Sequence, residues 1–279
     1  MTHTAETRDH VDAGRRALLP VFRRAVLDSW RSTLGWAAGL AAAVMLYLPL
    51  YPSIGTTQMM DVLDSMPPEL IKALGYEQIG SGAGYTQATI FGLIGFALLT
   101  IAATTWSSAA IAGAEESGRL ELMLGHAVSR VQYALESTLA LVVRLAALIA
   151  FTMALILVIN DSAQLELEPV NVLAASLAFL GLTVLTASVG LAVGAVSGRR
   201  AIATASAAGV AIAGYVMSAI GNQSADLEWL HRFSPYDWAY LNSPLTEGFD
   251  VGGLGLLFGL AAVVIGLAVV ALDRRDVTG

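Results

Sequence analysis

Six long apolar stretches dominate the sequence. They cover residues 33–51, 86–112, 134–159, 170–196, 201–221 and 251–272. A helix crosses the apolar part of a bilayer with about 20 mainly apolar residues, so each stretch is long enough for one span. The stretches are too long and too continuously apolar for the strands of a membrane barrel, which alternate polar and apolar residues. The pattern predicts an all-α integral membrane protein, in which residues 1–279 form one domain with six transmembrane helices.

The segment before the first apolar stretch, residues 15–32, has a different pattern. Leu18, Phe22, Val26 and Trp30 recur at every fourth position, and arginines cluster on another face. An apolar face with an aromatic anchor beside a basic face is typical of a helix that lies on anionic lipid headgroups. We therefore expect an amphipathic interfacial helix over residues 15–32. The alternative is that the arginines only help to orient the first span.

Two connections between spans are long enough to hold structure of their own. In the first, about 52–85, Pro67 followed by Gly75 indicates where a short helix starts and stops. In the last, about 222–250, prolines divide a segment rich in aromatic residues, which favour the membrane–water interface. We expect short extracellular helices in both connections.

Composition narrows the chemistry that the chain can perform. Hydrophobic residues make up 56% of the chain and charged residues 13%, and there is no cysteine. Without cysteine the chain forms neither a disulfide nor a thiolate metal site. Its one lysine, Lys72, lies in Leu-Ile-Lys-Ala and not in the Gly-Lys-Ser/Thr of a phosphate-binding loop, so the chain carries no ATPase site of that type. The net charge of −7 argues against a nucleic-acid partner, because nucleic-acid-binding surfaces are basic.

The charges outside the spans are sorted by sign. Twelve of the fifteen Lys and Arg residues fall on the side that carries both ends of the chain, two fall on the other side, and Arg144 lies within the third apolar stretch. Basic residues in short loops stay in the cytoplasm, so we expect a multi-pass plasma-membrane protein with both termini cytoplasmic. Twelve acidic residues lie on the other side, where they form a solvated surface or attract a cationic substrate.

The connection between the second and third stretches, residues 113–130, is longer than a simple turn needs. It begins with Glu115 and Glu116 and continues with three leucines, at 120, 122 and 124. Acidic residues suit the start of a helix because of the helix dipole, and exposed leucines need a cover. We expect a short amphipathic helix parallel to the membrane, covered either by the bundle or by a soluble partner.

This connection resembles a loop of the ABC-2 type permeases, the membrane subunits of a large class of ABC exporters. Residues 115–130 read Glu-Glu-Ser-Gly-Arg-Leu-Glu-Leu-Met-Leu-Gly-His-Ala-Val-Ser-Arg. This run is similar to the family pattern E-x-G-x-L-E-x-L-L-x-x-P-V-S-R, with Ala127 in place of the proline. The run Asp-Arg-Arg-Asp at 273–276 resembles the "RRD" ending of many members. Together with the six-span layout, the resemblance covers nearly the whole chain.

The resemblance implies an ABC-2 type exporter fold and a complex in which membrane transport and ATP hydrolysis belong to different chains. In that family the loop forms a coupling helix in a groove of a cytoplasmic ATPase subunit, and two permeases work with two ATPases by alternating access. This chain would pair with a second permease subunit, either a copy of itself or a sister chain. ATP and Mg²⁺ belong to the ATPase, so we expect no cofactor or metal on this chain.

The resemblance also implies what the chain moves and which residues couple it to ATP. The expected function is export of a hydrophobic or amphipathic compound, such as a drug, a natural product or a lipid. The residues expected to contact the ATPase are Glu115, Glu116, Ser117, Gly118, Arg119, Leu120, Glu121, Leu122 and Leu124.

Arg144 is the one charge deep within a predicted span, and an ionisable residue there is a candidate for transport or gating. The alternatives are that Arg144 extends to the interface or pairs with Glu136, eight residues earlier. An ATP-independent channel or secondary transporter is the second class of function, although such proteins usually bury acidic residues or break helices at the midplane. A membrane-embedded enzyme is the third class, and the histidines that it would need lie outside the spans, at His3, His10, His126 and His231.

Overall fold

The computed structural model describes residues 19–54, 65–67, 70, 79–125 and 128–275. In this part of the chain six helices are long and apolar enough to cross a membrane, and no strand is present. These helices are Trp30–Ser53, Gly82–Ala110, Arg130–Ile159, Pro169–Ser197, Arg200–Gly221 and Val251–Arg274. The predicted all-α membrane fold with six spans is therefore confirmed.

The spans are built from several helical elements, joined in places by 3₁₀ or π turns. In chain order the elements are α1 (Pro20–Asp28), α2 (Trp30–Tyr47), η1 (Leu48–Leu50), α3 (Tyr51–Ile54), α6 (Gly82–Thr86), η3 (Gln87–Leu93), α7 (Ile94–Ala110), α8 (Ala112–Glu116), α9 (Arg119–Leu124), α10 (Arg130–Ile159), α11 (Pro169–Ser197), α12 (Arg200–Gly221), η4 (Ala225–Phe233), α13 (Pro235–Tyr240), α14 (Pro244–Glu247) and α15 (Val251–Arg274).

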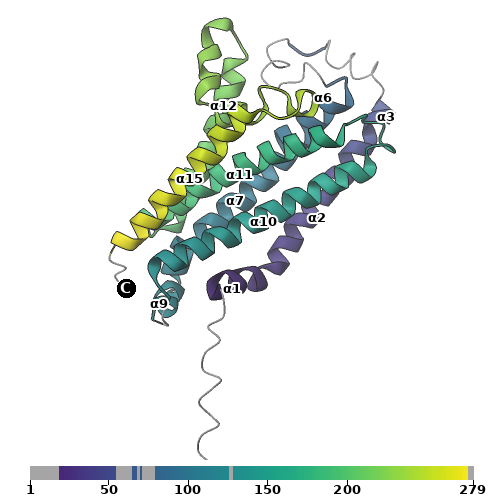
Figure 1. Ribbon diagram of the computed structural model, residues 1–279. Helices are drawn as coiled ribbons and strands as arrows, with labels where there is room; N and C mark the ends of the chain where they lie inside the picture. Colours follow the sequence, from purple (N-terminus) through teal and green to yellow (C-terminus); the bar gives the residue numbers. More distant parts are fainter. Residues whose placement is uncertain (1–18, 55–64, 68–69, 71–78, 126–127, 276–279) are drawn as a thin grey trace, which may run out of the picture.

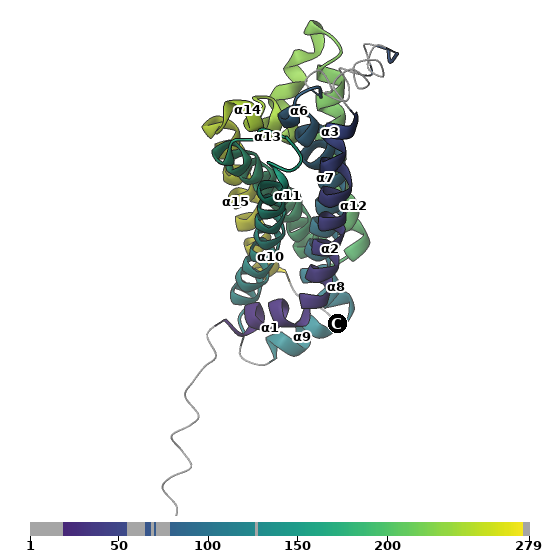
Figure 2. The same ribbon diagram turned by 90° about the vertical axis from the view of Figure 1, so that its right-hand side faces the viewer.

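The six spans run side by side in one elongated bundle (Figure 1). Helices α1 and α9 and the C-terminal end of α15 gather at one end, which we call the terminal end. Helices α3, α6, α13 and α14 lie at the opposite, distal end, and the view turned by 90° shows the same separation (Figure 2).

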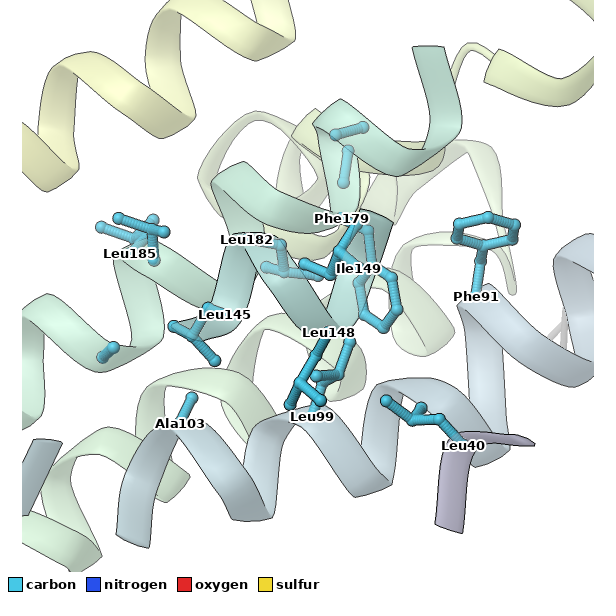
Figure 3. Close-up of a cluster of buried hydrophobic side chains, with 14 of the residues drawn as sticks. Leu40, Phe91, Leu99, Ala103, Leu145, Leu148, Ile149, Phe179, Leu182 and Leu185 are labelled. Carbon is cyan, nitrogen blue, oxygen red and sulfur yellow. The ribbon is translucent and has the colours of Figure 1, made fainter. Parts of the chain in front are cut away.

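Helix α11 forms the centre of the bundle. In its most apolar window 78% of the residues are buried, against 17% for α15, and α11 packs against α7, α10, α12 and α15. The core around it includes side chains from α2, η3, α7 and α10 (Figure 3). Phe91 and Phe179 meet edge to face with their ring centroids 5.5 Å apart, a favoured aromatic geometry.

Three buried hydroxyl groups of α11 are satisfied within the helix itself. Thr183, Thr186 and Ser188 donate hydrogen bonds of 2.7–2.9 Å to backbone carbonyls three or four residues earlier. A helix can therefore bury these hydroxyls in an apolar core without leaving them unpaired.

The N-terminal segment is helical over Pro20–Asp28, so its helix ends before the expected residue 32, and residues 15–18 of the expected helix lie outside the described residues. Helix α1 ends at Asp28, and Ser29 separates it from the first span with a non-helical backbone (φ −102°, ψ 3°). Trp30 is therefore the first residue of α2 and not the aromatic anchor of α1. Within α1, Phe22 and Val26 of the expected apolar face are partly buried and Arg23 and Arg24 are exposed, but the buried residue, Val21, lies outside that face.

The short helices expected between the fifth and sixth spans are present as η4, α13 and α14. Pro235 and Pro244 each occupy the first turn of one of them, a position where proline costs no hydrogen bond. The helix expected after Pro67 falls mostly outside the described residues.

Candidate functional site

The connection expected to form one coupling helix forms two short helices, α8 and α9. The break between them lies at Ser117 and Gly118, where Gly118 adopts a left-handed backbone conformation (φ 68°). Glycine adopts this conformation without the steric cost that a side chain brings. The Ser117 hydroxyl donates to the Gly113 carbonyl over 2.7 Å and accepts a hydrogen bond from Arg119 Nε over 2.9 Å. The expected single helix is corrected to a bent pair.

The three leucines of this connection have different surroundings. Leu120 is completely buried in the core of the chain, Leu124 is partly buried against that core, and Leu122 is 66% exposed. The expectation that all three leucines face a partner is therefore wrong for Leu120, because the bundle itself covers this side chain. The positions of the three leucines in the sequence did not reveal which of them points inward.

The exposed side chains of α8 and α9 form a compact surface at the terminal end, which we call the coupling surface. It carries one large apolar group among polar and charged ones. Its members are Glu116, Ser117, Arg119, Glu121 and Leu122.

The two glutamates of α8 bind the chain's own elements. Glu115 forms an ion pair with Arg275, which follows α15, and both side chains are about four-fifths buried. Arg275 Nη1 also donates to the Ala195 carbonyl near the end of α11, over 3.0 Å. Glu116 accepts a hydrogen bond from the backbone N–H of Arg200, at the start of α12, over 2.8 Å. Helix α8 is therefore joined directly to the start of α12 and to the end of α15, and through Arg275 to the end of α11.

A further arginine completes this attachment. Arg130, the first residue of α10, donates from Nη1 to the backbone carbonyls of Arg275, over 2.7 Å, and Asp273, over 3.3 Å. In the sequence, the run at 273–276 is identified only by its resemblance to the ending of ABC-2 type permeases, and no role follows from that resemblance. Its Arg275 is the residue that joins the end of α15 to α8.

Glu136 holds the start of α1. Its side chain is 3% exposed, and its Oε2 accepts hydrogen bonds from the backbone N–H groups of Val21 and Phe22 over 2.7 and 3.0 Å. Its Oε1 accepts a third from Gln132 Nε2 over 2.7 Å. Since α1 has no side-chain cap of its own, a carboxylate from α10 satisfies these donors and also suits the positive end of the helix dipole.

Arg144 joins three spans and does not pair with Glu136. Its guanidinium Cζ lies 3.6 Å from the centroid of the Trp106 ring on α7, and its Nε donates to Thr33 Oγ1 on α2 over 3.2 Å. Trp106 Nε1 in turn donates to Ser32 Oγ over 3.1 Å. The buried Nη2 of Arg144 has no hydrogen-bond partner among the described residues. The contact with Thr33, the fourth residue of α2, places the guanidinium toward the terminal end.

A six-span bundle with a structured, partly exposed connection at one end is the architecture of a membrane permease. The family model described as multidrug efflux system permease Rv1217c, C-terminal domain, matches residues 25–272. Because the match covers most of the chain, this chain belongs to that family of efflux permeases, and the resemblance to ABC-2 type permeases is confirmed. A comparison with curated proteins finds no match.

The described residues contain no group of three or more His, Cys, Asp or Glu side chains placed to hold a metal ion. A cavity lies at the distal end, between α6, η3, α12, η4, α13 and α14, and sequence reasoning did not anticipate it.

Proposed function

We propose that the chain is the membrane subunit of an ATP-driven exporter that moves hydrophobic or amphipathic compounds out of the cell. The terminal end faces the cytoplasm, and a separate ATPase subunit binds the coupling surface. A second permease, identical or a sister chain, completes the membrane part. Membership of an efflux permease family and the bias of basic residues toward the terminal end support this assignment.

The observation that carries the proposal is the attachment of the coupling surface to the spans. Glu115 and Glu116 connect α8 to the end of α15 and the start of α12, so a force applied to α9 reaches these spans through polar contacts and not through a flexible loop. On the coupling surface, the exposed Leu122 provides the apolar contact that a soluble subunit would bury. Burying a whole leucine side chain stabilises a complex by about 1.5–3 kcal/mol.

The proposal is tested by ATP-dependent uptake of an amphipathic dye into inside-out vesicles that contain the chain and its ATPase. We expect uptake to require ATP and to be lost in the variant Leu122→Asp, which introduces a charge at the contact. The matched control is Leu70→Asp, because Leu70 is 48% exposed in the connection between α3 and α6. Equal transport by Leu122→Asp would refute the coupling assignment, and transport without ATP would establish a channel or secondary transporter instead.

A further inference from the structure

Arg144 carries a positive charge that no carboxylate among the described residues balances. Its contacts with the Trp106 ring and the Thr33 hydroxyl are contacts with neutral groups. Glu136, the acid of the same helix, holds the start of α1, and the ion pairs within the described part of the chain do not include Arg144. Charged residues within membrane spans usually pair with an opposite charge or reach the interface. The described chain therefore leaves this charge uncompensated.

The guanidinium is held in one orientation with one nitrogen left for an outside acceptor. The Thr33 hydroxyl donates to the Ser29 carbonyl over 3.2 Å, so its oxygen is the acceptor for Arg144 Nε, while the Trp106 ring covers one face of the guanidinium. Nη2 is enclosed by protein, whereas Nη1 is not enclosed and makes no hydrogen bond to a described residue. Since the side chain as a whole is partly exposed, Nη1 is the donor that an external acceptor can reach.

Ser32 provides a second donor beside the same indole ring. Trp106 Nε1 donates to Ser32 Oγ over 3.1 Å, so the serine oxygen is the acceptor in this contact and the hydroxyl proton is left for another acceptor. Ser32 is also exposed. The indole of Trp106 therefore positions two donors, the N–H groups of Arg144 Nη1 and the O–H group of Ser32, and both are suited to an anion.

These donors lie at the depth of lipid headgroups. Ser32 and Thr33 are the third and fourth residues of α2, and Trp106 lies four residues before the end of α7. At a rise of 1.5 Å per residue, they are about 3–6 Å from the helix ends at the terminal end (Figure 1). The polar layer on each side of a bilayer is roughly 5–7 Å thick, and tryptophan favours that layer. The donors are therefore level with the phosphates of the leaflet on the terminal side.

The surface beside the donors is apolar. Leu34 follows Thr33 in α2, Leu139 and Val143 precede Arg144 in α10, and the side chains of these three apolar residues are exposed. A free inorganic anion would leave them uncovered, whereas the acyl chains of a lipid cover them. An acceptor that combines a negative charge with apolar chains therefore matches both parts of this surface.

We propose that Arg144 and Ser32 bind the phosphate of an anionic phospholipid in the leaflet on the terminal side. Nη1 and the serine hydroxyl donate to phosphate oxygens, and the acyl chains lie along the exposed leucines and valine. The net negative charge of phosphatidylglycerol compensates the arginine, whereas phosphatidylcholine carries a cation of its own. The site needs neither the ATPase nor a cargo, so the inference goes beyond the proposed function and does not depend on it.

The test titrates the full-length permease, in detergent and without the ATPase, with phosphatidylglycerol or phosphatidylcholine, and native mass spectrometry gives the dissociation constant of the first lipid bound. We expect phosphatidylglycerol to bind about fivefold more tightly. Arg144→Gln should weaken its binding by about tenfold and abolish the preference, and Ser32→Ala should weaken it by about threefold. The matched control Arg232→Gln removes the same charge from an exposed side chain at the distal end and should bind like the unchanged protein.

The same titration contains the results that would overturn the proposal. Equal affinity of the unchanged protein for the two lipids would exclude recognition of a net negative charge. Equal affinity of the unchanged protein and Arg144→Gln for phosphatidylglycerol would exclude the site. If Arg144→Gln does not fold, Ser32→Ala decides in the same way, because this exposed side chain can be shortened without risk to the fold. Displacement of the lipid by inorganic phosphate would show that the site recognises a free anion, and would overturn the lipid assignment.

Discussion

The capping of α1 by Glu136 gives the most quantitative expectation. The variant Glu136→Leu places an apolar side chain in the site and removes Oε2, the oxygen that accepts from both the Val21 and the Phe22 N–H groups. Hydrogen bonds to a charged group contribute about 1.5–3 kcal/mol each, and water reaching the partly buried Phe22 N–H recovers some of that. We expect α1 to lose about 2–4 kcal/mol of local stability, which corresponds to a roughly 30-fold to 700-fold rise in opening.

Amide hydrogen exchange of residues 21–28, followed by mass spectrometry on the protein in nanodiscs, measures this opening directly. Protection in α1 should fall by the stated factor in Glu136→Leu and by less in Glu136→Gln, which keeps one acceptor oxygen. Gln132→Leu is the matched control, because it removes only the third hydrogen bond of the carboxylate. Unchanged exchange of α1 in Glu136→Leu would refute the idea that this carboxylate holds the helix.

Three further expectations concern the bundle and its terminal end. Arg144→Gln should lower the free energy of unfolding by about 1–2 kcal/mol through loss of the Trp106 contact, and transport should fall only in proportion to the amount of folded protein. Lost transport at an unchanged free energy of unfolding would instead indicate a gating role. Gly253→Ala should destabilise the fold by about 1–3 kcal/mol, because a Cβ there would lie 2.0 Å from the Trp238 carbonyl, whereas Gly255→Ala meets no described atom within 4 Å and should be neutral or stabilising in the same melting experiment. Arg275→Gln should leave the ATPase bound but reduce cargo moved per ATP hydrolysed, because Glu115 loses its partner; unchanged stoichiometry would count against a mechanical link.

The sequence predicted the elements that depend on local pattern. Six apolar runs correspond to six spans because a long, mainly apolar run has few alternatives in a membrane. The prolines at 235 and 244 located the short helices before the last span, and the amphipathic spacing located α1. The C-terminal end of α1 could not be predicted in the same way. The apolar spacing continues through Trp30, whereas the break at Ser29 depends on how α1 connects to the first span.

The contacts that join distant parts of the chain could not be read from the sequence. Glu136 and Arg144 are eight residues apart on one helix, yet one binds α1 and the other Trp106. Leu120 and Leu122 lie on opposite faces of α9, because two residues cover about 200° of a helix turn. Which of them is buried depends on how α9 packs on the bundle after the bend at Gly118. The π-helix at Gln87 has no periodic signature at all, so the distal cavity became visible only in three dimensions.

The central claim is that a soluble ATPase sits on the coupling surface, and the absence of cysteine allows a direct measurement of it. A single cysteine introduced by Leu122→Cys carries a thiol-linked photo-crosslinker in membranes that contain the ATPase. We expect an adduct with the ATPase from this position, and none from Leu70→Cys at the distal end or from Leu120→Cys, whose side chain is buried. An adduct from Leu70→Cys, or none from Leu122→Cys while the ATPase remains bound, would contradict the claim.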